Sequence, residues 1–552
     1  MSASDKKKLR KEQATNMLTE RQRQEQAEAK KLKAYTITFT AIMICIVVAV
    51  LGVLAVRTVN NSGVIQKNTL AATIGDKELN SVEFSYYYTD AINDTYSEWY
   101  SQYDSYTDDY LKVMGLDTTK PLDEQINPDT EASWAQFFID AALTQAKEDF
   151  ALYNKAVEEK FELPEDEQKS LDNMLKNIET YAALYGYSNA NQYLRANYGY
   201  GAELESYSEY LTRSTIATAF YKAHEENLTY KDEDIREYDD KDPIKFNSYS
   251  YSNCYLSYTE FLQGGTKGED GKTTYTEEEN AAARKALKEA ADKLAAAKDV
   301  EEMKELAETI EVNASGQVAV NDFTNKLYSG ISSPIKEWLA DENRKIGDIE
   351  AVPNTSTTTD EDGKEITEIN GYYILVYQGI NDNTKLMSNV RHLLVKFEGG
   401  TTDESTGETT YTDKEKAAAK EKAEGYLKTY LEGKKDEDSF IELVKKYSKD
   451  SSASEGGLFE DIHYNSNYVA NFKNWAVDAK RKAGDTEVIE TEYGYHVMYY
   501  VGDSDTTYRD MMITDEMRTN DQDEWFEALS KPVTAKEGDT SKLKLDLVLS
   551  GN

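Results

Sequence analysis

Cysteine and histidine are both scarce in this chain, and their scarcity excludes several kinds of site. Only two cysteines occur among 552 residues, Cys45 and Cys254, and Cys45 lies within a long apolar stretch. A framework of disulfides within one domain is therefore excluded. The four histidines and two cysteines form no cluster with metal-ligand spacing, which argues against a zinc site. We expect no metal and no cofactor.

Positive charge is also in short supply. The chain has 63 lysines and arginines against 102 acidic residues, a formal net charge of −39. A nucleic-acid-binding surface requires a stripe of basic residues that neutralises phosphates, so the charge argues against nucleic acid as a partner. Tyrosine, in contrast, is abundant, with 41 residues. Its apolar body and polar tip suit surfaces that are half-buried or that bind peptides.

The length of the chain predicts three or four domains, and its first residues predict a membrane anchor. Residues 1–33 form a basic tail with ten lysines and arginines against five acids. Residues 34–56, AYTITFTAIMICIVVAVLGVLAV, match the ~20 apolar residues that cross a bilayer. The positive charge before them places the N-terminus in the cytoplasm and everything after Arg57 outside. A cleaved signal peptide is the alternative, but the long basic leader favours an uncleaved anchor.

Beyond a polar linker, residues 57–69, the pattern becomes mainly helical. A short strand and a Gly-Asp turn begin this region, and three later segments repeat apolar or aromatic residues at a spacing near 3.6. We therefore predict a helical, chaperone-like region over residues 70–243. His224, near its end, is predicted to be a solvated helix residue and not part of a site.

Two stretches of the following sequence repeat one another. SPIKEWLADENRKIGDIEAV matches ANFKNWAVDAKRKAGDTEVI, and in both a tryptophan precedes a Gly-Asp pair by nine residues. Further on, NGYYILVYQG matches YGYHVMYYVG, and upstream each stretch has an alanine-rich helix that begins with a Thr-x-x-Glu capping box. Such self-similarity predicts repeated structural units. We predict two copies of one α+β unit, at residues 244–380 and 388–503.

The two copies differ where polar chemistry is expected. The first has Tyr373 where the second has His496, and its opening strand contains no histidine. It also lacks a counterpart of YSKDSSASEGGL and carries a polar insert, residues 354–368, that we predict to be a mobile loop. Residues 504–552 complete the chain with a helix and a strand, KLKLDLVLS, which needs a partner strand elsewhere in the extracellular part.

Three of the four histidines lie between residues 390 and 501. His392 stands before LLV and His496 before VMYY, so each occupies an apolar strand at one end of the second copy. A histidine in such a place is usually a buried polar residue with one partner, and this interpretation remains open. Two histidines that bracket a small domain, and that the first copy lacks, are a stronger indication of a functional pair.

The second copy resembles the parvulin family of peptidyl-prolyl cis/trans isomerases. The resemblance runs through RHLLV, YSKDSSASEGGLF, FKNWAVDAKRKAGDTEVI and TEYGYHVMYY, in the order found in that family. The whole chain is similar to the PrsA and SurA foldases, with a helical chaperone region, parvulin modules and a C-terminal segment that returns to the N-terminal region. The implied fold class is α+β: a helical region, two parvulin-like modules of which the first is degenerate, and an N-terminal transmembrane helix.

The resemblance also implies roles for particular residues. It makes His392 and His496 the histidine pair of the family, and it puts Asp450, in YSKD, at the position that parvulins fill with cysteine or aspartate. It further implies an apolar slot for the proline ring and two residues that shape the approach to the second histidine. The slot consists of Leu458, Tyr468 and Phe472, with Tyr468 in place of a more usual methionine, and the other two residues are Thr491 and Tyr493, the latter in place of a common serine.

The expected function is isomerisation of X–Pro bonds in unfolded or newly secreted proteins, with holdase chaperone activity, by a single-pass membrane protein whose bulk is extracytoplasmic. Some parvulins select phosphorylated Ser/Thr-Pro through a basic cluster, but the corresponding loop here, EGGTTDESTGETTYTD, is acidic and argues against that selection. A holdase that uses parvulin-like modules only as a peptide-binding scaffold is the alternative. A purely structural envelope protein is a further one.

Overall fold

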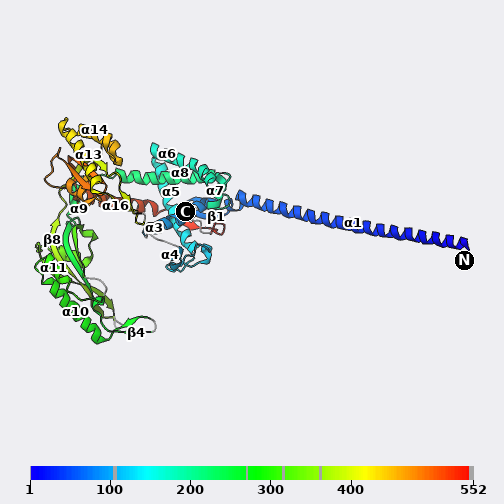
Figure 1. The fold of residues 1–552 in the computed structure, drawn as a ribbon, viewed down its shortest axis with the longest axis horizontal. Helices are drawn as coiled ribbons and strands as arrows, with labels where there is room; N and C mark the ends of the chain where they lie inside the picture. Colours follow the sequence, from blue (N-terminus) through cyan, green and yellow to red (C-terminus); the bar gives the residue numbers. More distant parts are fainter. Residues whose placement is uncertain are drawn as a thin grey trace. The chain divides into compact units, whose positions relative to one another are not determined.

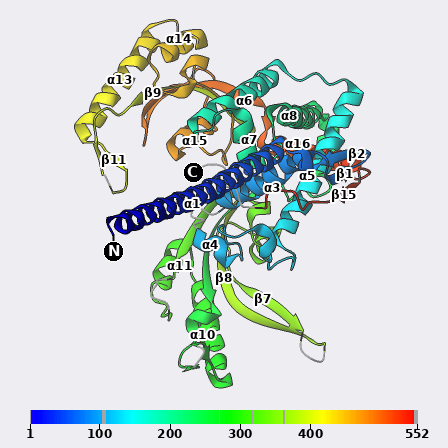
Figure 2. The same cartoon turned by 90° about the vertical axis from the view of Figure 1, so that its right-hand side faces the viewer.

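The chain divides into two compact units, and Figures 1 and 2 show its elements in two views. The computed structural model describes residues 2–102, 108–268, 271–313, 318–359, 363–403 and 405–545. The first unit comprises Met1–Leu228 with Asn520–Asn552, and the second comprises Thr229–Thr519. Helices and sheets occur in both units, so the mixed helix and sheet class predicted from the sequence is confirmed.

The first unit begins with one long helix, α1 (Ala3–Ser62). From Ile42 to Lys67 the chain is long and apolar enough to cross a membrane, by length and composition. The predicted linker is largely helical, because α1 extends into it and α2 (Val64–Lys67) follows directly after Gly63, which adopts a left-handed φ of 64°. A Cβ at Gly63 would lie 2.1 Å from Cα of Gly201, so the close packing of these two backbone segments requires glycine.

Helices α3 to α8 form the body of the first unit, and aromatic side chains fill its core. Their apolar residues recur at helical spacing, so each helix presents one face to this core. Tyr86, Phe84 and Phe138 have no exposed surface. The helices span α3 (Ser81–Gln102), α4 (Asp108–Val113), α5 (Trp134–Glu159), α6 (Glu165–Leu184), α7 (Ala190–Tyr198) and α8 (Leu204–Asn227).

The C-terminal segment returns to the first residues of the helical region. The strand β15 (Ala535–Glu537) pairs with β1 (Leu70–Ile74), which in turn pairs with β2 (Lys77–Asn80). The strand predicted at KLKLDLVLS differs, because its described part, residues 542–545, is not a strand. Leu543 instead packs as a buried side chain in the core of this unit. A strand forms where a partner is available, here at residues 535–537.

His224 is packed, contrary to the prediction of a solvated residue. Its ring stacks on Trp525 with the centroids 3.7 Å apart, and its Nδ1 lies 2.6 Å from Oε1 of Gln522. Both partners belong to α16 (Tyr508–Ser530), which is far away in the sequence. The helical pattern around His224 contains no sign of this partner, so the prediction was wrong for a tertiary reason.

The second unit contains two four-stranded antiparallel sheets with the same strand order. In the first copy the order is β6-β3-β8-β7, and in the second it is β12-β9-β14-β13, with helices in corresponding places. The first copy has β3 (Ser248–Ser257), α10 (Glu277–Ala295), α11 (Val300–Ala307), β6 (Val320–Leu327), α12 (Ser333–Leu339), β7 (Ile349–Thr359) and β8 (Glu365–Asn381). The second has β9 (Leu386–Lys396), α13 (Asp413–Glu432), α14 (Glu437–Tyr447), β12 (Leu458–Ile462), α15 (Ala470–Ala476), β13 (Thr486–Thr491) and β14 (Gly494–Thr507).

The polar insert of the first copy is a β-hairpin. β7 and β8 continue into it as a paired ladder from Thr355↔Ile369 to Thr359↔Glu365, so residues 354–359 and 365–368 are strands and the predicted mobile loop was wrong for them. The composition is polar, but threonine is β-branched and favours the extended backbone of a strand. Figure 2 shows the two strands projecting as an arm from the rest of the sheet.

A buried arginine ties the elements of the second unit together where α16 begins. Arg509 is only 6% exposed, and its Nε donates to Oδ2 of Asp239, at the end of α9 (Asp232–Asp239), over 2.8 Å. Its Nη1 donates to Oδ1 of Asn247 and to the carbonyl oxygen of Asp382, each over 3.0 Å. Residues just before β3, just after β8 and at the start of α16 therefore share one cation.

Candidate active site

The two histidines of the second copy lie on neighbouring central strands and face one another. His392 on β9 is opposite Met498, and His496 on β14 is opposite Leu394, so the two histidines are diagonal neighbours on one face of the sheet. Their Nδ1 atoms are 2.8 Å apart, and the side chains are buried, with 2% and 5% exposure. A bond between two Nδ1 atoms requires that one ring donates a proton and the other accepts it.

A third side chain extends this hydrogen bond, and its hydroxyl can donate either to His496 or, over 3.4 Å, to the carbonyl oxygen of Gly494. Oγ1 of Thr491, at the end of β13, is 2.8 Å from Nε2 of His496, and the backbone N–H of Tyr493 donates to the same oxygen over 3.2 Å. When the threonine hydroxyl donates to Nε2, His496 carries its proton on Nδ1 and donates to His392. His392 then carries its proton on Nε2. In this arrangement each ring nitrogen of His496 has one hydrogen-bond partner.

Asp450 lies next to Nε2 of His392, at the end of this chain of hydrogen bonds. It caps the short 3₁₀ helix Ser451–Glu455, and its Oδ1 accepts from the backbone N–H of Ser452 over 2.9 Å. The same oxygen lies 3.5 Å from Nε2 of His392, within ion-pair range but without hydrogen-bond geometry, and this buried nitrogen has no other polar partner among the described residues. His392 and the serine bonds hold the pKa of Asp450 well below its usual range, so the carboxyl group is ionised.

Burial sets the charge of the histidine pair. It lowers the pKa of His496 from 6.5 to about 3, and the neighbouring His392 adds to the decrease while Asp450 opposes it. Burial removes the solvation of the charged form, and a second cationic ring next to the first would be repelled. At neutral pH His496 is therefore uncharged. His496 can therefore share a proton with His392 through the Nδ1–Nδ1 hydrogen bond without carrying a charge itself.

An aromatic wall stands beside the histidines. The ring centroids of Phe459 and Phe472 lie 5.0 and 5.3 Å from that of His392, and both contacts are edge to face. Tyr468 packs on both phenylalanines, at 5.4 and 5.6 Å, and is 37% exposed. Phe472 is buried. The wall is therefore apolar, rigid and open to solvent at the tyrosine, which suits a flat apolar ring.

Leu458 and Tyr493 were also predicted for the site, and each has a different environment. Leu458 is opposite Arg391, whose Nε donates to Glu437 of α14 over 2.7 Å, so Leu458 lies on the helix-covered face of the sheet, away from the histidines. Phe459, the next residue, takes the place in the wall that the sequence had suggested for Leu458. Tyr493 contributes its backbone N–H to Thr491, while its side chain is 59% exposed.

Glycine is required where the chain reaches the first histidine. The backbone N–H of His392 donates to the carbonyl oxygen of Gly457 over 2.9 Å. Gly457 has a φ of 65°, and a Cβ there would lie 2.2 Å from the carbonyl oxygen of His392. Only glycine combines this left-handed backbone with so close an approach. The Gly-Gly of the sequence thus sets the entry of β12, and with it the position of Phe459.

The first copy has other residues in the same register. Tyr373 is opposite Tyr255 as His496 is opposite Leu394, and Asn253 is opposite Leu375 as His392 is opposite Met498. Tyr373 and Tyr255 pack with centroids 4.6 Å apart. The first copy therefore has no histidine pair at this place. Among the described residues, no group of three or more histidines, cysteines or acids is arranged to hold a metal ion.

Part of the chain is similar to known proteins. The family described as "Rotamase: PPIC-type PPIASE domain" matches residues 392–502. Among solved structures, the chain is similar to the PPIase domain of TbPar42, with 26% identity, coverage of 21% of this chain and 98% of that one, and a TM-score of 0.16. A search of curated proteins returned no match.

Two further similar structures are the peptidylprolyl isomerase PrsA from Bacillus anthracis and PrsA from Bacillus subtilis. Each is 23% identical over 27% of this chain, with TM-scores of 0.17 and 0.16. The matches cover 59% and 55% of those two chains, little more than half of each.

Proposed function

We propose, on the premise that residues 392–502 form a peptidyl-prolyl isomerase domain of the PPIC or parvulin type, that the chain isomerises X–Pro bonds in unfolded secreted proteins from a membrane-anchored position. One observation carries the proposal. His392 and His496 share a hydrogen bond, Nε2 of His392 faces the ionised Asp450 at 3.5 Å, and the ring of His392 lies next to an aromatic wall that is open to solvent at Tyr468.

The reaction needs a binding site for a twisted bond and no nucleophile. Rotation about X–Pro faces a barrier of ~18–20 kcal/mol because the C–N bond is partly double, and it takes tens to hundreds of seconds uncatalysed. We assign Phe459, Phe472 and Tyr468 to the proline ring. Holding the ring while the preceding carbonyl turns favours the twisted state over both planar ones. Preferential binding of that state is the catalysis.

Asp450 supplies the electrostatic part of this preference. In the planar amide, resonance puts partial negative charge on the carbonyl oxygen, and the twisted state loses that charge. An ionised carboxylate near the oxygen disfavours the planar form, and the effect is stronger where the site is dry. His392 and His496 act as positioning residues, because the Thr491–His496–His392 chain keeps a donor directed at Asp450.

Anchoring and holdase activity complete the proposal. The apolar helix from Ile42 to Lys67 supports a single membrane span, and the basic residues before it support a cytoplasmic N-terminus. Exposed apolar and aromatic side chains in the helical region support binding of unfolded chains. They include Met174, Tyr181, Leu184 and Tyr185. The acidic loop at residues 398–413 supports unmodified X–Pro substrates over phosphorylated ones.

A holdase without isomerase activity is the second candidate. It is favoured by the first copy, which has the same sheet order but Asn253 and Tyr373 at the histidine positions. A parvulin-like, degenerate module of that kind serves as scaffold or as a peptide-binding surface.

A protease-coupled isomerisation assay on the full chain separates the two candidates. We expect catalysis in the wild type and its loss in Phe472→Ala, with thermal unfolding measured alongside to confirm that the variant is folded. Ile335→Ala, at the corresponding position of the first copy, is the matched control and should leave the rate unchanged. Absence of catalysis in the wild type would leave the holdase as the function of this chain.

A further inference from the structure

The arm of the first copy leaves one strand edge open. β3 pairs with β8 up to Ser257↔Gly371, and β3 then turns away into the 3₁₀ helix Tyr258–Phe261. Residues 365–369 of β8 pair with β7 on one side only. In the part of the chain that the structure describes, no strand occupies the other side. The place that a continued β3 would fill is vacant over five or so residues.

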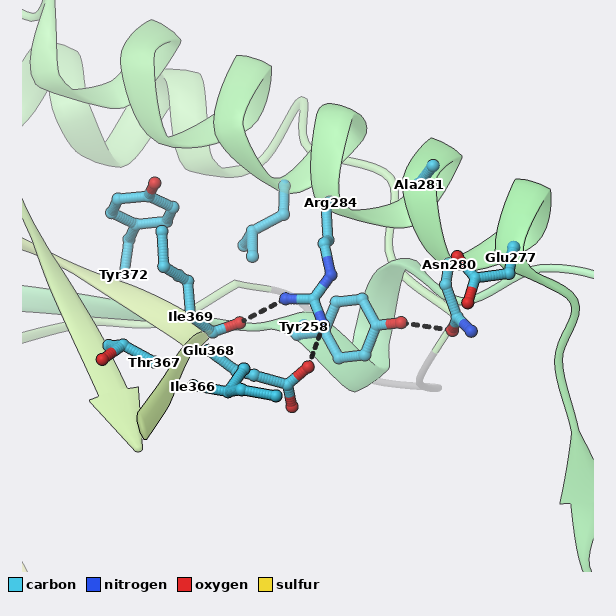
Figure 3. Close-up of a pocket in the computed structure, with 11 residues that line it drawn as sticks. Tyr258, Glu277, Asn280, Ala281, Arg284, Ile366, Thr367, Glu368, Ile369 and Tyr372 are labelled. Carbon is cyan, nitrogen blue, oxygen red and sulfur yellow. Dashed lines mark hydrogen bonds and ion pairs between the residues drawn. The ribbon is translucent and has the colours of Figure 1, made fainter. Parts of the chain in front are cut away.

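A contact with α10 shows which backbone groups face this open side. Nη1 of Arg284 donates to the carbonyl oxygen of Ile369 over 3.3 Å (Figure 3). In an antiparallel ladder the N–H and C=O of one residue point to the same side, and alternate residues share that side. Ile369, Thr367 and Glu365 therefore direct their backbone groups away from β7. The hydroxyls of Thr357 and Thr367, 3.3 Å apart, fit a pair without ladder hydrogen bonds.

A groove runs along this edge. It has a volume of about 730 Å³ and lies between α10 and the arm (Figure 3). Tyr258, Tyr372 and Leu287 give it an apolar floor, and Ile366, which is 42% exposed, adds an aliphatic side. Its one guanidinium group, on Arg284, pairs with Glu368 over 3.2 Å. The groove thus offers apolar surface beside the backbone of Thr367, and it has no net positive charge because Glu277 and Glu368 line it together with Arg284.

β7 is an edge strand of the sheet and has a proline just before the arm begins. β7 carries Pro353 in its ladder, opposite Tyr372, and proline on an edge strand removes a donor and discourages pairing. The described part of β8 from Glu365 to Asn370 has no proline. The edge of residues 365–369 differs from the β7 edge in lying beside a groove, and an open edge next to a groove is the arrangement used by proteins that bind peptides through strand addition.

We propose that the edge of residues 365–369 and the adjoining groove bind an extended segment of unfolded polypeptide as an added antiparallel strand. The backbone of Thr367 and Glu365 supplies the hydrogen bonds, and an apolar side chain of the segment lies on Tyr258 and Tyr372. Proline is not required in the segment, so this site holds a client independently of the isomerase site. The inference rests on the proposed function only in that the clients are unfolded chains.

The test uses the full chain in lipid nanodiscs and a fluorescein-labelled, proline-free peptide, Lys-Thr-Val-Thr-Phe-Thr-Val-Lys. Anisotropy gives its affinity, and hydrogen exchange gives protection of the segment 364–370. Thr367→Pro removes an N–H from the open edge, and we expect about tenfold weaker binding, the worth of a lost hydrogen bond and its neighbours. Thr357→Pro is the matched control, since it removes an N–H from the other edge of the same arm, and it should leave affinity within about twofold.

A second variant tests the groove itself. Ile366→Asp places a charge on an exposed side chain of the groove and should also weaken binding, without disturbing the core. Equal effects of Thr367→Pro and Thr357→Pro, or no protection of residues 364–370, would overturn the inference. Isomerase activity is measured on the same samples. Its persistence leaves the proposed function intact whatever the peptide does, and its absence in the wild type counts against the isomerase alone.

Discussion

The two copies of the second unit share a scaffold contact that the sequence repeat had marked with a tryptophan. In each copy the indole N–H donates to a glutamate, over 2.7 Å in the first and 2.8 Å in the second, and an arginine stacked on the indole pairs with that glutamate. The residues are Trp338, Glu350 and Arg344 in the first copy and Trp475, Glu487 and Arg481 in the second. This contact fixes the helix and the following strand.

The helix starts are equally alike. Glu279 and Glu415 close the capping boxes of α10 and α13, and each also accepts from a glycine N–H of the preceding loop over 2.9 Å, Gly265 in one copy and Gly400 in the other. The tryptophan and glutamate contacts are the same in both copies, so we infer that the shared fold requires them. They tie helix, loop and sheet together, and none of them touches the histidine pair.

The copies differ in what lies on the shared scaffold. The second has His392, His496 and Phe472, while the first has Asn253, Tyr373 and Ile335 at the corresponding positions, together with the arm and its groove. The fold therefore persists without the histidines. In the second copy they are an addition to the scaffold, which is why a functional role explains them better than a structural one.

The largest expected effect concerns the shared scaffold. Trp338→Ala and Trp475→Ala each remove a buried indole and leave a glutamate and an arginine without their partner, so each should lower the free energy of unfolding of its own copy by about 3–5 kcal/mol. Hydrogen exchange resolved by copy is the measurement. If one tryptophan proves dispensable, the scaffold contact is not equivalent in the two copies.

We expect acid to lower the stability of the second copy more than that of the first. Burial lowers the pKa of His496 to about 3 and that of His463 to about 4, both from 6.5. Between these values and 6.5 the unfolded chain binds more protons than the folded one, so stability is complete above pH 6.5 and falls as the pH falls. The second copy should therefore lose stability from about pH 6.5 downward, and Asp450 adds to the loss only below its ordinary value of 3.8.

The first copy provides the control for this acid effect, because residues 244–380 contain no histidine and Tyr373 stands at the place of His496. Hydrogen exchange of each copy between pH 7.5 and 4 is the measurement. Equal acid sensitivity of the two copies would show that the buried histidines are not the cause.

Thr491→Val tests the hydrogen bond between Thr491 and His496, which the first copy lacks a histidine to form. It removes the hydrogen-bond partner of Nε2 of His496, so the imidazole chain is no longer held in one arrangement, and kcat/KM should fall about tenfold with a stability loss of about 1 kcal/mol. Thr491→Ser keeps the hydroxyl and should keep the rate. A serine variant as slow as the valine variant would point to packing and not to the hydrogen bond.

The smallest effect is expected at Leu458. It lies on the helix-covered face of β12, so Leu458→Ala should change the KM for a proline peptide by no more than about twofold, the scale of residues outside a site. Phe459→Ala, one residue further, should raise the KM clearly. The reverse order of the two effects would contradict the face that the register assigns to each residue.

Much of this architecture could be predicted from the sequence, because scarce residues and repeated patterns survive without a structure. His392 and His496 could be predicted as site residues because only four histidines occur, and the repeated spacing from Trp to Gly-Asp indicated the duplication. The choice between Leu458 and Phe459 could not be made, because a shift of one residue moves a strand side chain to the other face.

Other features depend on partners that are distant in the sequence. The arm at residues 354–368 has a loop-like composition, and its strands form because β7 and β8 pair with each other beyond the sheet. His224 is packed only because Trp525 arrives from the C-terminal helix. The partner of β1 is residues 535–537. None of these contacts leaves a local pattern.

The central claim is that the second copy alone carries the isomerase activity, and that this activity depends on the carboxylate charge of Asp450 beside the histidine pair. The direct measurement is kcat/KM of the full chain for Asp450→Asn, which retains the cap of the Ser451–Glu455 turn and removes the charge, and for Asn253→Ala in the first copy. The account predicts about a 100-fold loss in the former, the scale of removing one preorganised electrostatic group, and no change in the latter. Full activity of Asp450→Asn, or a loss in Asn253→Ala, would contradict it.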